Sequence, residues 1–205
     1  MPDGCLDVLI TQGSMAEPDS QTHGSSLRLT HWDFRARLVS QYKGQKTIGY
    51  RLRPGVTLDS EQLGDVKPTT DNVEQWLVEQ AKKGVEVCEL IDELCIDNTS
   101  LQQVARKSGV SIRTLQRHFS ARGLPPPDYW RRLARVRNAA AALTTTDAVV
   151  DIAGHFGFSD QSHLTREFVQ WFSVTPKRLR RNPELLNELC QPGLGNWTTE
   201  QISIR

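Results

Sequence analysis

Residues 149–181, VVDIAGHFGFSDQSHLTREFVQWFSVTPKRLRR, contain two helical patterns separated by a glycine. Ile152 and Phe156 recur at the spacing of one helix face, which predicts a short amphipathic helix. Gly157 predicts the end of that helix, because glycine adopts left-handed backbone angles without steric cost. Ser159 can then cap the next helix, and Asp160 is the alternative cap. A short helix, a tight turn and a capped second helix form the layout of a helix-turn-helix unit.

The second predicted helix of this stretch is amphipathic. Its apolar stripe, expected to face the core, consists of Leu164, Phe168, Trp171 and Phe172. The side chains left on the outer face are Asp160, Gln161, Ser162, His163, Thr165, Arg166 and Gln170. Such side chains can hydrogen-bond to base edges and phosphates. A solvated surface helix is the alternative, but the basic residues that follow, Lys177, Arg178, Arg180 and Arg181, favour DNA binding.

The same pattern occurs a second time upstream, in SLQQVARKSGVSIRTLQRHFSARG at residues 100–123. Ser100 and Gln103 predict a capping box. The matching positions are Ala105, Gly109, Ser111, Leu115, Arg117 and Phe119 with Ala153, Gly157, Ser159, Leu164, Arg166 and Phe168. The offset is 48 residues through the serine and 49 after it. This indicates an internal repeat of one helix-turn-helix unit, with one residue added in the second copy.

A helix is predicted between the two copies, after a run of prolines. Tyr129, Leu133, Val136 and Ala140 are expected to face inward. The arginines expected to face mostly outward are Arg131, Arg132, Arg135 and Arg137. Sixteen helical residues at ~1.5 Å each span roughly 24 Å. Such a helix can hold two units near the roughly 34 Å that brings successive major grooves onto one face of DNA.

The predicted fold class is mainly α, with two helix-turn-helix units joined by a linker helix and a small β-containing N-terminal segment. An acidic amphipathic helix at 85–97 has an apolar face that needs a partner, either in this chain or in another copy. The predicted divisions are a disordered N-terminus at 1–26, a short β-rich segment at 27–70, connecting helices at 71–97, a DNA-binding domain at 98–182 and a tail at 183–205. Within the domain, the units lie at 100–122 and 147–172, and the linker helix at 126–143.

The charge of the chain is distributed unevenly, although its net value is only +1. Residues 101–181 contain 14 lysines and arginines against 5 acidic residues, whereas the remainder contains 11 against 19. A basic block of this kind predicts a polyanionic partner. The four cysteines show no metal-ligand spacing, which fits a reducing cytoplasm, and no export signal or membrane-spanning run is recognised. We expect neither a metal nor a cofactor.

The quoted stretches resemble the AraC/XylS family of bacterial transcription regulators, over about residues 85–181. The resemblance depends on SIRTLQRHFSARG, the arginine-rich linker helix and IAGHFGFSDQSHLTREFVQWFSVTPKRLR. In the family, both reading helices enter adjacent major grooves of double-stranded DNA. By position, the resemblance implies DNA contacts from Arg113, Thr114, Gln116, Arg117, Gln161, Ser162, His163, Thr165, Arg166, Lys177 and Arg178. The region before the domain is shorter than is usual in the family, and IGYRLRPGVTL resembles the end of a sensory domain.

Two other functions compete with sequence-specific regulation. A protein that pairs with full-length regulators through the acidic helix at 85–97 is one alternative. An enzyme is the other, and it is not expected, because no catalytic motif such as HExxH, a P-loop or GxSxG occurs. RNA polymerase, a second copy of the chain and a small-molecule effector stay open as further partners.

Overall fold

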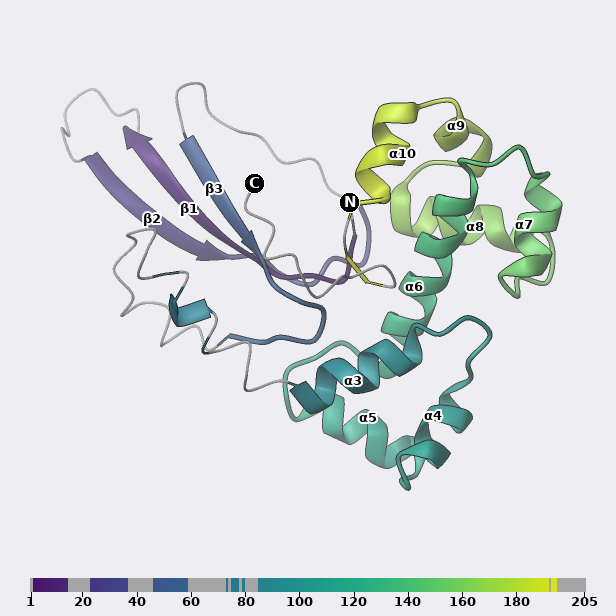
Figure 1. Cartoon of the computed structure of the whole chain (residues 1–205), viewed down its shortest axis with the longest axis horizontal. Coiled ribbons are helices and arrows are strands. Elements are labelled where there is room, and N and C mark those ends of the chain that lie inside the picture. Colours follow the sequence, from purple (N-terminus) through teal and green to yellow (C-terminus); the bar gives the residue numbers. More distant parts are fainter. Residues whose placement is uncertain are drawn as a thin grey trace.

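The computed structural model describes residues 2–14, 23–36, 46–58, 73, 75–77, 79, 85–191 and 193–194. In these residues a three-stranded antiparallel sheet lies beside a larger group of helices (Figure 1). The predicted mainly α class with a small β-containing segment is therefore confirmed. The predicted connecting helices at 71–97 lie partly outside the described residues, and the stretch 59–72 lies wholly outside them.

The sheet has the order β2-β1-β3, with β1 (Asp7–Ser14) between β2 (His23–Leu29) and β3 (Lys46–Arg51). Val8 is opposite Leu29 on one side and Tyr50 on the other. Leu6, Val8 and Ile10 alternate along the strand and are all buried, as the two-residue period of a strand requires. The predicted disorder of 1–26 is wrong for β1 and for the start of β2, because this apolar face packs into a core.

The helices are α3 (Val85–Leu94), α4 (Leu101–Lys107), α5 (Ile112–Ser120), α6 (Pro127–Ala142), α7 (Val149–His155), α8 (Gln161–Phe172), α9 (Pro176–Arg180) and α10 (Pro183–Leu189). Helix α6 runs between two groups: α3, α4 and α5 lie toward one end, and α7 to α10 lie toward the other (Figure 1). Trp130, Leu133 and Val136 of α6 are each 0% exposed. Helix α6 thus supplies the part of the core that both groups share.

Helix α3 has its apolar partner inside this chain. Val87, Ile91 and Leu94 are buried in the same core cluster as Trp130 of α6. Cys88, on a neighbouring face of α3, packs instead in the core beneath the sheet. The helix therefore connects the two cores, and its apolar face is already covered.

The prediction that Arg137 faces outward is wrong. Its side chain is 4% exposed. The guanidinium donates hydrogen bonds to the carbonyl oxygens of Pro2 at 3.3 Å, Gln191 at 2.8 Å and Leu194 at 3.1 Å. Arg137 lies on the inward face of α6, one turn after Leu133, and the two chain ends supply the acceptors that a buried cation needs.

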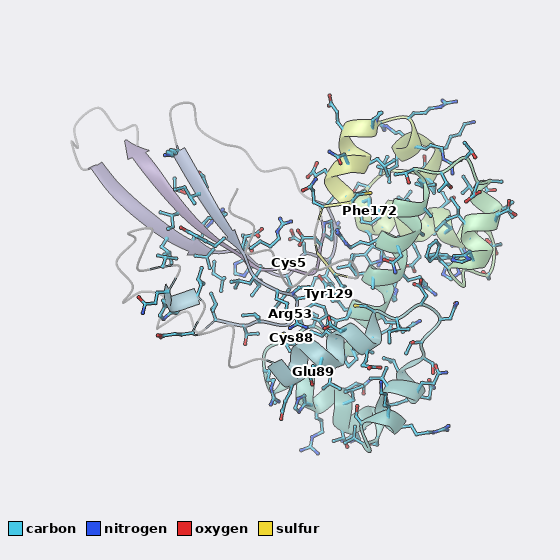
Figure 2. The ribbon with its side chains drawn as sticks, viewed as in Figure 1. Cys5, Arg53, Cys88, Glu89, Tyr129 and Phe172 are labelled. Atoms are coloured by element: carbon cyan, nitrogen blue, oxygen red, sulfur yellow. The ribbon has the colours of Figure 1, made fainter. Side chains whose placement is uncertain are left out.

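A second connection between the sheet and the helices is made by the residues that follow β2. The Tyr129 hydroxyl donates to the carbonyl oxygen of Asp33 at 2.9 Å, and the Ala36 N–H donates to the carbonyl oxygen of Trp171 at 2.8 Å. The ring of Trp32 packs edge-on against that of Trp130, with centroids 5.1 Å apart. Tyr129 marks this junction in Figure 2. The N-terminal segment is thereby fixed to both α6 and α8.

Candidate nucleic-acid interface

The first helix-turn-helix unit has the predicted caps. Ser100 Oγ accepts a hydrogen bond from the Gln103 N–H at 3.2 Å, and Gln103 Oε1 accepts one from the Ser100 N–H at 2.7 Å. Gly109 follows α4 with a φ of +68°. Ser111 Oγ then accepts from the Thr114 N–H at 3.1 Å and begins α5. These bonds satisfy backbone donors that the helix itself leaves unpaired.

The second unit has the predicted turn but a different cap. Gly157 has a φ of +70°, and a Cβ there would lie 2.8 Å from Asn98 Oδ1. Asp160, rather than the predicted Ser159, caps α8, because Asp160 Oδ1 accepts from the His163 N–H at 2.7 Å. That backbone hydrogen bond lowers the pKa of the Asp160 carboxyl.

The position of the cap shows where the additional residue of the second unit lies. The caps Ser111 and Asp160 are 49 residues apart, whereas the glycines Gly109 and Gly157 are 48 apart. The insertion therefore lies in the turn before α8. From the caps onward the equivalent pairs are Arg113 and Ser162, Thr114 and His163, Gln116 and Thr165, Arg117 and Arg166, and His118 and Glu167.

The predicted DNA-contacting residues are accessible on α5, α8 and α9. The exposed ones are Arg113, Thr114, Gln116, Arg117, Gln161, Ser162, Arg166, Lys177 and Arg178, and the half-buried ones are His163 and Thr165. The apolar stripe on the opposite face of α8 is buried as predicted, with Leu164 and Phe168 each 0% exposed. Each reading helix therefore presents a polar face away from its core.

Several of these side chains already have local partners. Thr165 Oγ1 donates to the carbonyl oxygen of Gln161 at 2.8 Å. His163 Nδ1 lies 3.2 Å from Ser159 Oγ. Thr114 Oγ1 lies 2.9 Å from Ser111 Oγ in the first unit. Arg113, Arg117 and Arg166 are exposed and carry a positive charge, which makes them the stronger candidates for contact with a polyanion.

The basic residues after α8 divide into two kinds. Thr175, before a proline that suits the first position of a helix, caps α9 by accepting from the Arg178 N–H at 3.3 Å. Lys177 and Arg178 are exposed on this short helix. Arg180 instead donates to the carbonyl oxygens of Leu143 at 3.3 Å and Asp147 at 2.7 Å. Arg180 therefore holds the loop before α7 in place.

A buried ion pair supports α8 from the inside. Glu167, whose side chain is 10% exposed, accepts from Arg132 of α6 at 2.7 Å. Its second oxygen accepts from Trp171 Nε1 at 3.1 Å. The signal for this pair is in the sequence, because an acidic residue at position 167 falls on the inward side of a helix whose neighbours are apolar. The pair fixes the rotation of α8 about its axis relative to α6.

Among the described residues, no cluster of three or more His, Cys, Asp or Glu side chains could hold a metal ion. In the same part of the chain, no helix has the length and apolar character needed to cross a membrane.

Comparison with known proteins agrees with this geometry. A family model described as "Helix-turn-helix domain" matches residues 104–182. The protein named "Probable transcription factor PqrA" of Proteus vulgaris is 34% identical over 96 residues, which cover 46% of this chain and 78% of PqrA. The chain belongs to the AraC/XylS family.

Two further relatives match this AraC/XylS chain over shorter parts of their own length. The HTH-type transcriptional regulator RipA of Corynebacterium glutamicum is 34% identical over 107 residues, 52% of this chain and 32% of RipA. The HTH-type transcriptional activator RhaS of Escherichia coli O157:H7 is 37% identical over 87 residues, 42% of this chain and 31% of RhaS. The chain thus spans about a third of the length of these two relatives.

Proposed function

We propose that this AraC/XylS chain is a sequence-specific regulator of transcription that inserts α5 and α8 into adjacent major grooves of double-stranded DNA. Phosphate contacts supply most of its affinity, and the two reading helices supply its specificity. The further partners that we propose for such a regulator are RNA polymerase and a second copy of the chain.

The proposal depends on the equivalent placement of one arginine on each of the two helices α5 and α8. Arg117 and Arg166 occupy the same position on two capped helices, both are exposed, and both helices pack on the same linker helix α6. The N-terminal part of a recognition helix reads base edges in helix-turn-helix proteins. An arginine one and a half turns into the helix can reach guanine O6 and N7, which is the commonest specific contact.

The names of the relatives support a role in transcription, because RipA is named a transcriptional regulator and RhaS a transcriptional activator. The alternative, a protein that acts by pairing with other regulators through residues 85–97, is not favoured. Its docking face would be the apolar side of α3, and Ile91 and Leu94 on that side are each 0% exposed in the core of this chain.

Selection of bound DNA from a random library, with the whole chain, tests the proposal. We expect one motif with two conserved parts about one helical turn apart. On that motif, Arg117→Ala and Arg166→Ala should each weaken binding by about 1–3 kcal/mol and relax the preference at one part only. Arg28→Ala, a change on the exposed side of β2, is the matched control. A library that returns no motif, or mutants that bind like wild type, would refute the proposal.

A further inference from the structure

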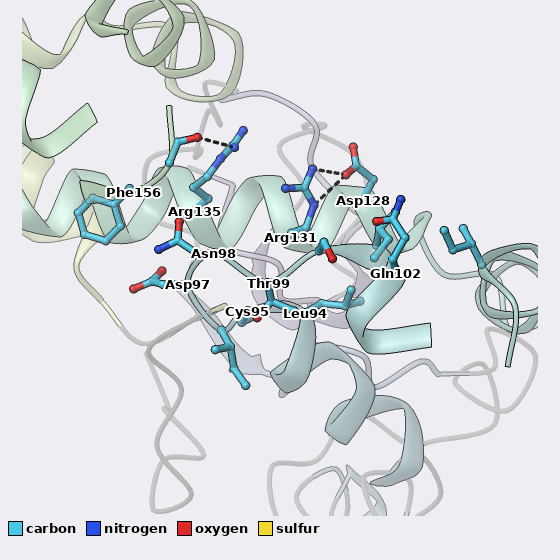
Figure 3. Close-up of a pocket in the computed structure, with 15 residues that line it drawn as sticks. Leu94, Cys95, Asp97, Asn98, Thr99, Gln102, Asp128, Arg131, Arg135 and Phe156 are labelled. Carbon is cyan, nitrogen blue, oxygen red and sulfur yellow. Dashed lines mark hydrogen bonds and ion pairs between the residues drawn. The ribbon is translucent and has the colours of Figure 1, made fainter. Parts of the chain in front are cut away.

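A groove of about 380 Å³ lies between the two helix-turn-helix units. The first unit contributes residues 100–102 at the start of α4 and Ile112 at the start of α5. The second unit contributes Phe156 and Gly157 from the turn before α8, and α6 contributes Asp128, Arg131 and Arg135 (Figure 3). The groove therefore borders both units and their linker helix.

Three of the charged groups in this groove are already paired or hydrogen-bonded. Arg131 donates to Asp128 Oδ1 through Nε at 3.0 Å and through an η nitrogen at 2.6 Å (Figure 3). Asp97 accepts a hydrogen bond from the Asn138 side chain at 3.0 Å. These groups have little capacity left for an additional charged ligand.

Arg135 is in a different situation. Among the described residues, no carboxylate lies within ion-pair distance of its guanidinium, and its Nε is buried without a hydrogen-bond partner. One η nitrogen lies 3.5 Å from the carbonyl oxygen of Gly157, and the guanidinium lies 4.5 Å from the ring centre of Phe158. These contacts orient the guanidinium, and although Glu167 and Asp128 lie near enough to stabilise its charge, neither forms a direct ion pair with it.

The surroundings of Arg135 favour an anion. Burial, together with the nearby charges of Arg131 and Arg132, lowers the pKa of Arg135. A bound anion would relieve this unfavourable environment and could accept charge-assisted hydrogen bonds. Glu167, the nearest acid on α8, is committed to Arg132 and Trp171.

The position of the groove identifies the anion. If α5 and α8 enter adjacent major grooves, the minor groove and its two phosphate strands must pass between the units. We propose that the groove binds a phosphodiester of the DNA backbone at the middle of the site, with Arg135 as the contacting residue. This inference rests on the proposed function. It assigns to the linker helix a sequence-independent contact that holds both reading helices in register on the DNA.

The first test compares wild type, Arg135→Gln and Arg28→Gln on the selected motif and on random DNA at several salt concentrations. We expect Arg135→Gln to bind both DNAs roughly tenfold more weakly, and the slope of log K against log salt to fall by about 1. Arg28→Gln removes the same charge from the sheet and should keep the wild-type slope. An Arg135→Gln protein with wild-type affinity and slope overturns the inference.

The second test does not depend on the folding of a variant. Methylphosphonate groups replace single phosphates along the selected motif, and the affinity of the wild-type protein is measured for each. We expect neutral groups between the two reading sites to weaken wild type roughly tenfold and to leave Arg135→Gln unchanged. If central neutralisation has no effect on wild type, the inference fails while the proposed function stands. If wild type selects no motif at all, both fail.

Discussion

The two helix-turn-helix units share one backbone plan but differ in what their reading helices carry. Helix α5 presents Arg113 and Arg117, whereas the equivalent positions of α8 hold Ser162 and Arg166. The inner residue also differs, since His118 in the first unit corresponds to Glu167 in the second. Under the proposed function, we expect this difference to separate two tasks: α5 carries more positive charge toward DNA, and α8 is joined to the linker helix by an ion pair.

Helix α8 has two polar contacts to other parts of the protein, whereas the polar attachment of the first unit is an ion pair between Lys107 of α4 and Glu93 of α3. Glu167 joins α8 to α6 through Arg132, and the Ala36 N–H bonds to the carbonyl of Trp171 near the end of α8. In the first unit, His118 Nε2 is buried without a hydrogen-bond partner among the described residues. The first unit therefore has one unsatisfied polar atom where the second has a satisfied ion pair. We expect the first unit to move more easily when it meets DNA.

The largest expected effect concerns this inner position. Glu167→Gln removes the charge that Arg132 and Trp171 share, so it should lower the free energy of unfolding by about 1.5–3 kcal/mol. The equivalent change in the first unit, His118→Gln, should alter it by no more than about 0.5 kcal/mol. Urea unfolding followed by circular dichroism measures both. Equal effects of the two changes would remove the contrast between the units.

A smaller effect is expected at the first outward position of each reading helix. Arg113→Ala should weaken binding to the selected DNA by about 1–3 kcal/mol. Ser162→Ala, at the equivalent position, should weaken binding to the same DNA by about 0.5–1.5 kcal/mol, because the change removes only a hydrogen bond from an uncharged side chain. Fluorescence anisotropy with labelled DNA gives both values, and the salt slope should fall only for Arg113→Ala. A larger loss from Ser162→Ala would reverse the division of tasks.

The smallest expected effect is a difference in pH dependence between the cap of α8 and the cap of α5. The pKa of Asp160 is lowered from the ordinary value of 3.8 by the His163 N–H. Because the folded-state pKa is the lower one, the stabilisation of α8 is complete above about pH 4 and is lost as the pH falls through the lowered value. The cap of α5 is the uncharged Ser111, so α5 should show no such dependence.

Backbone amide chemical shifts between pH 5 and pH 2 test this difference within one molecule. The His163 amide should titrate in the acid range, whereas the Thr114 amide should stay constant. The Asp160→Asn variant keeps a capping oxygen but has no carboxyl group. In this variant the chemical shift of the His163 backbone amide should no longer change with pH in the acid range. Parallel titration of both amides in wild type would show that acid acts on the whole fold rather than on the cap.

The local features of the DNA-binding domain were predictable from the sequence because they depend on neighbouring residues. Gly109 and Gly157 mark turns, and Ser100 and Thr175 mark caps, by chemistry that operates within a few positions. For the cap of α8 the sequence favoured Ser159 and left Asp160 as the alternative, and the structure has Asp160. Both Ser159 and Asp160 can cap a helix, and only the length of the turn decides between them.

The errors elsewhere arise from contacts between distant parts of the chain. Strand β1 pairs with residues that follow it by 9 to 21 positions in β2 and by 34 to 44 positions in β3. Its alternating Leu6, Val8 and Ile10 therefore lie in sequence surroundings that resemble a disordered tail. Arg137 falls on the apolar face of α6, but an arginine predicts exposure until its acceptors at the chain ends are known. The groove at Arg135 likewise requires two units that are separate in the sequence.

The burial of Arg137 has a consequence for how the protein is made. Its carbonyl acceptors belong to Pro2, Gln191 and Leu194, so the set is complete only after residue 194 has been synthesised. Until then the guanidinium on the inner face of the linker helix lacks two of these three acceptors, which opposes early closure of the core. Synthesis from the N-terminus therefore delays the final closure around α6 until residues 191–194 can pack against it.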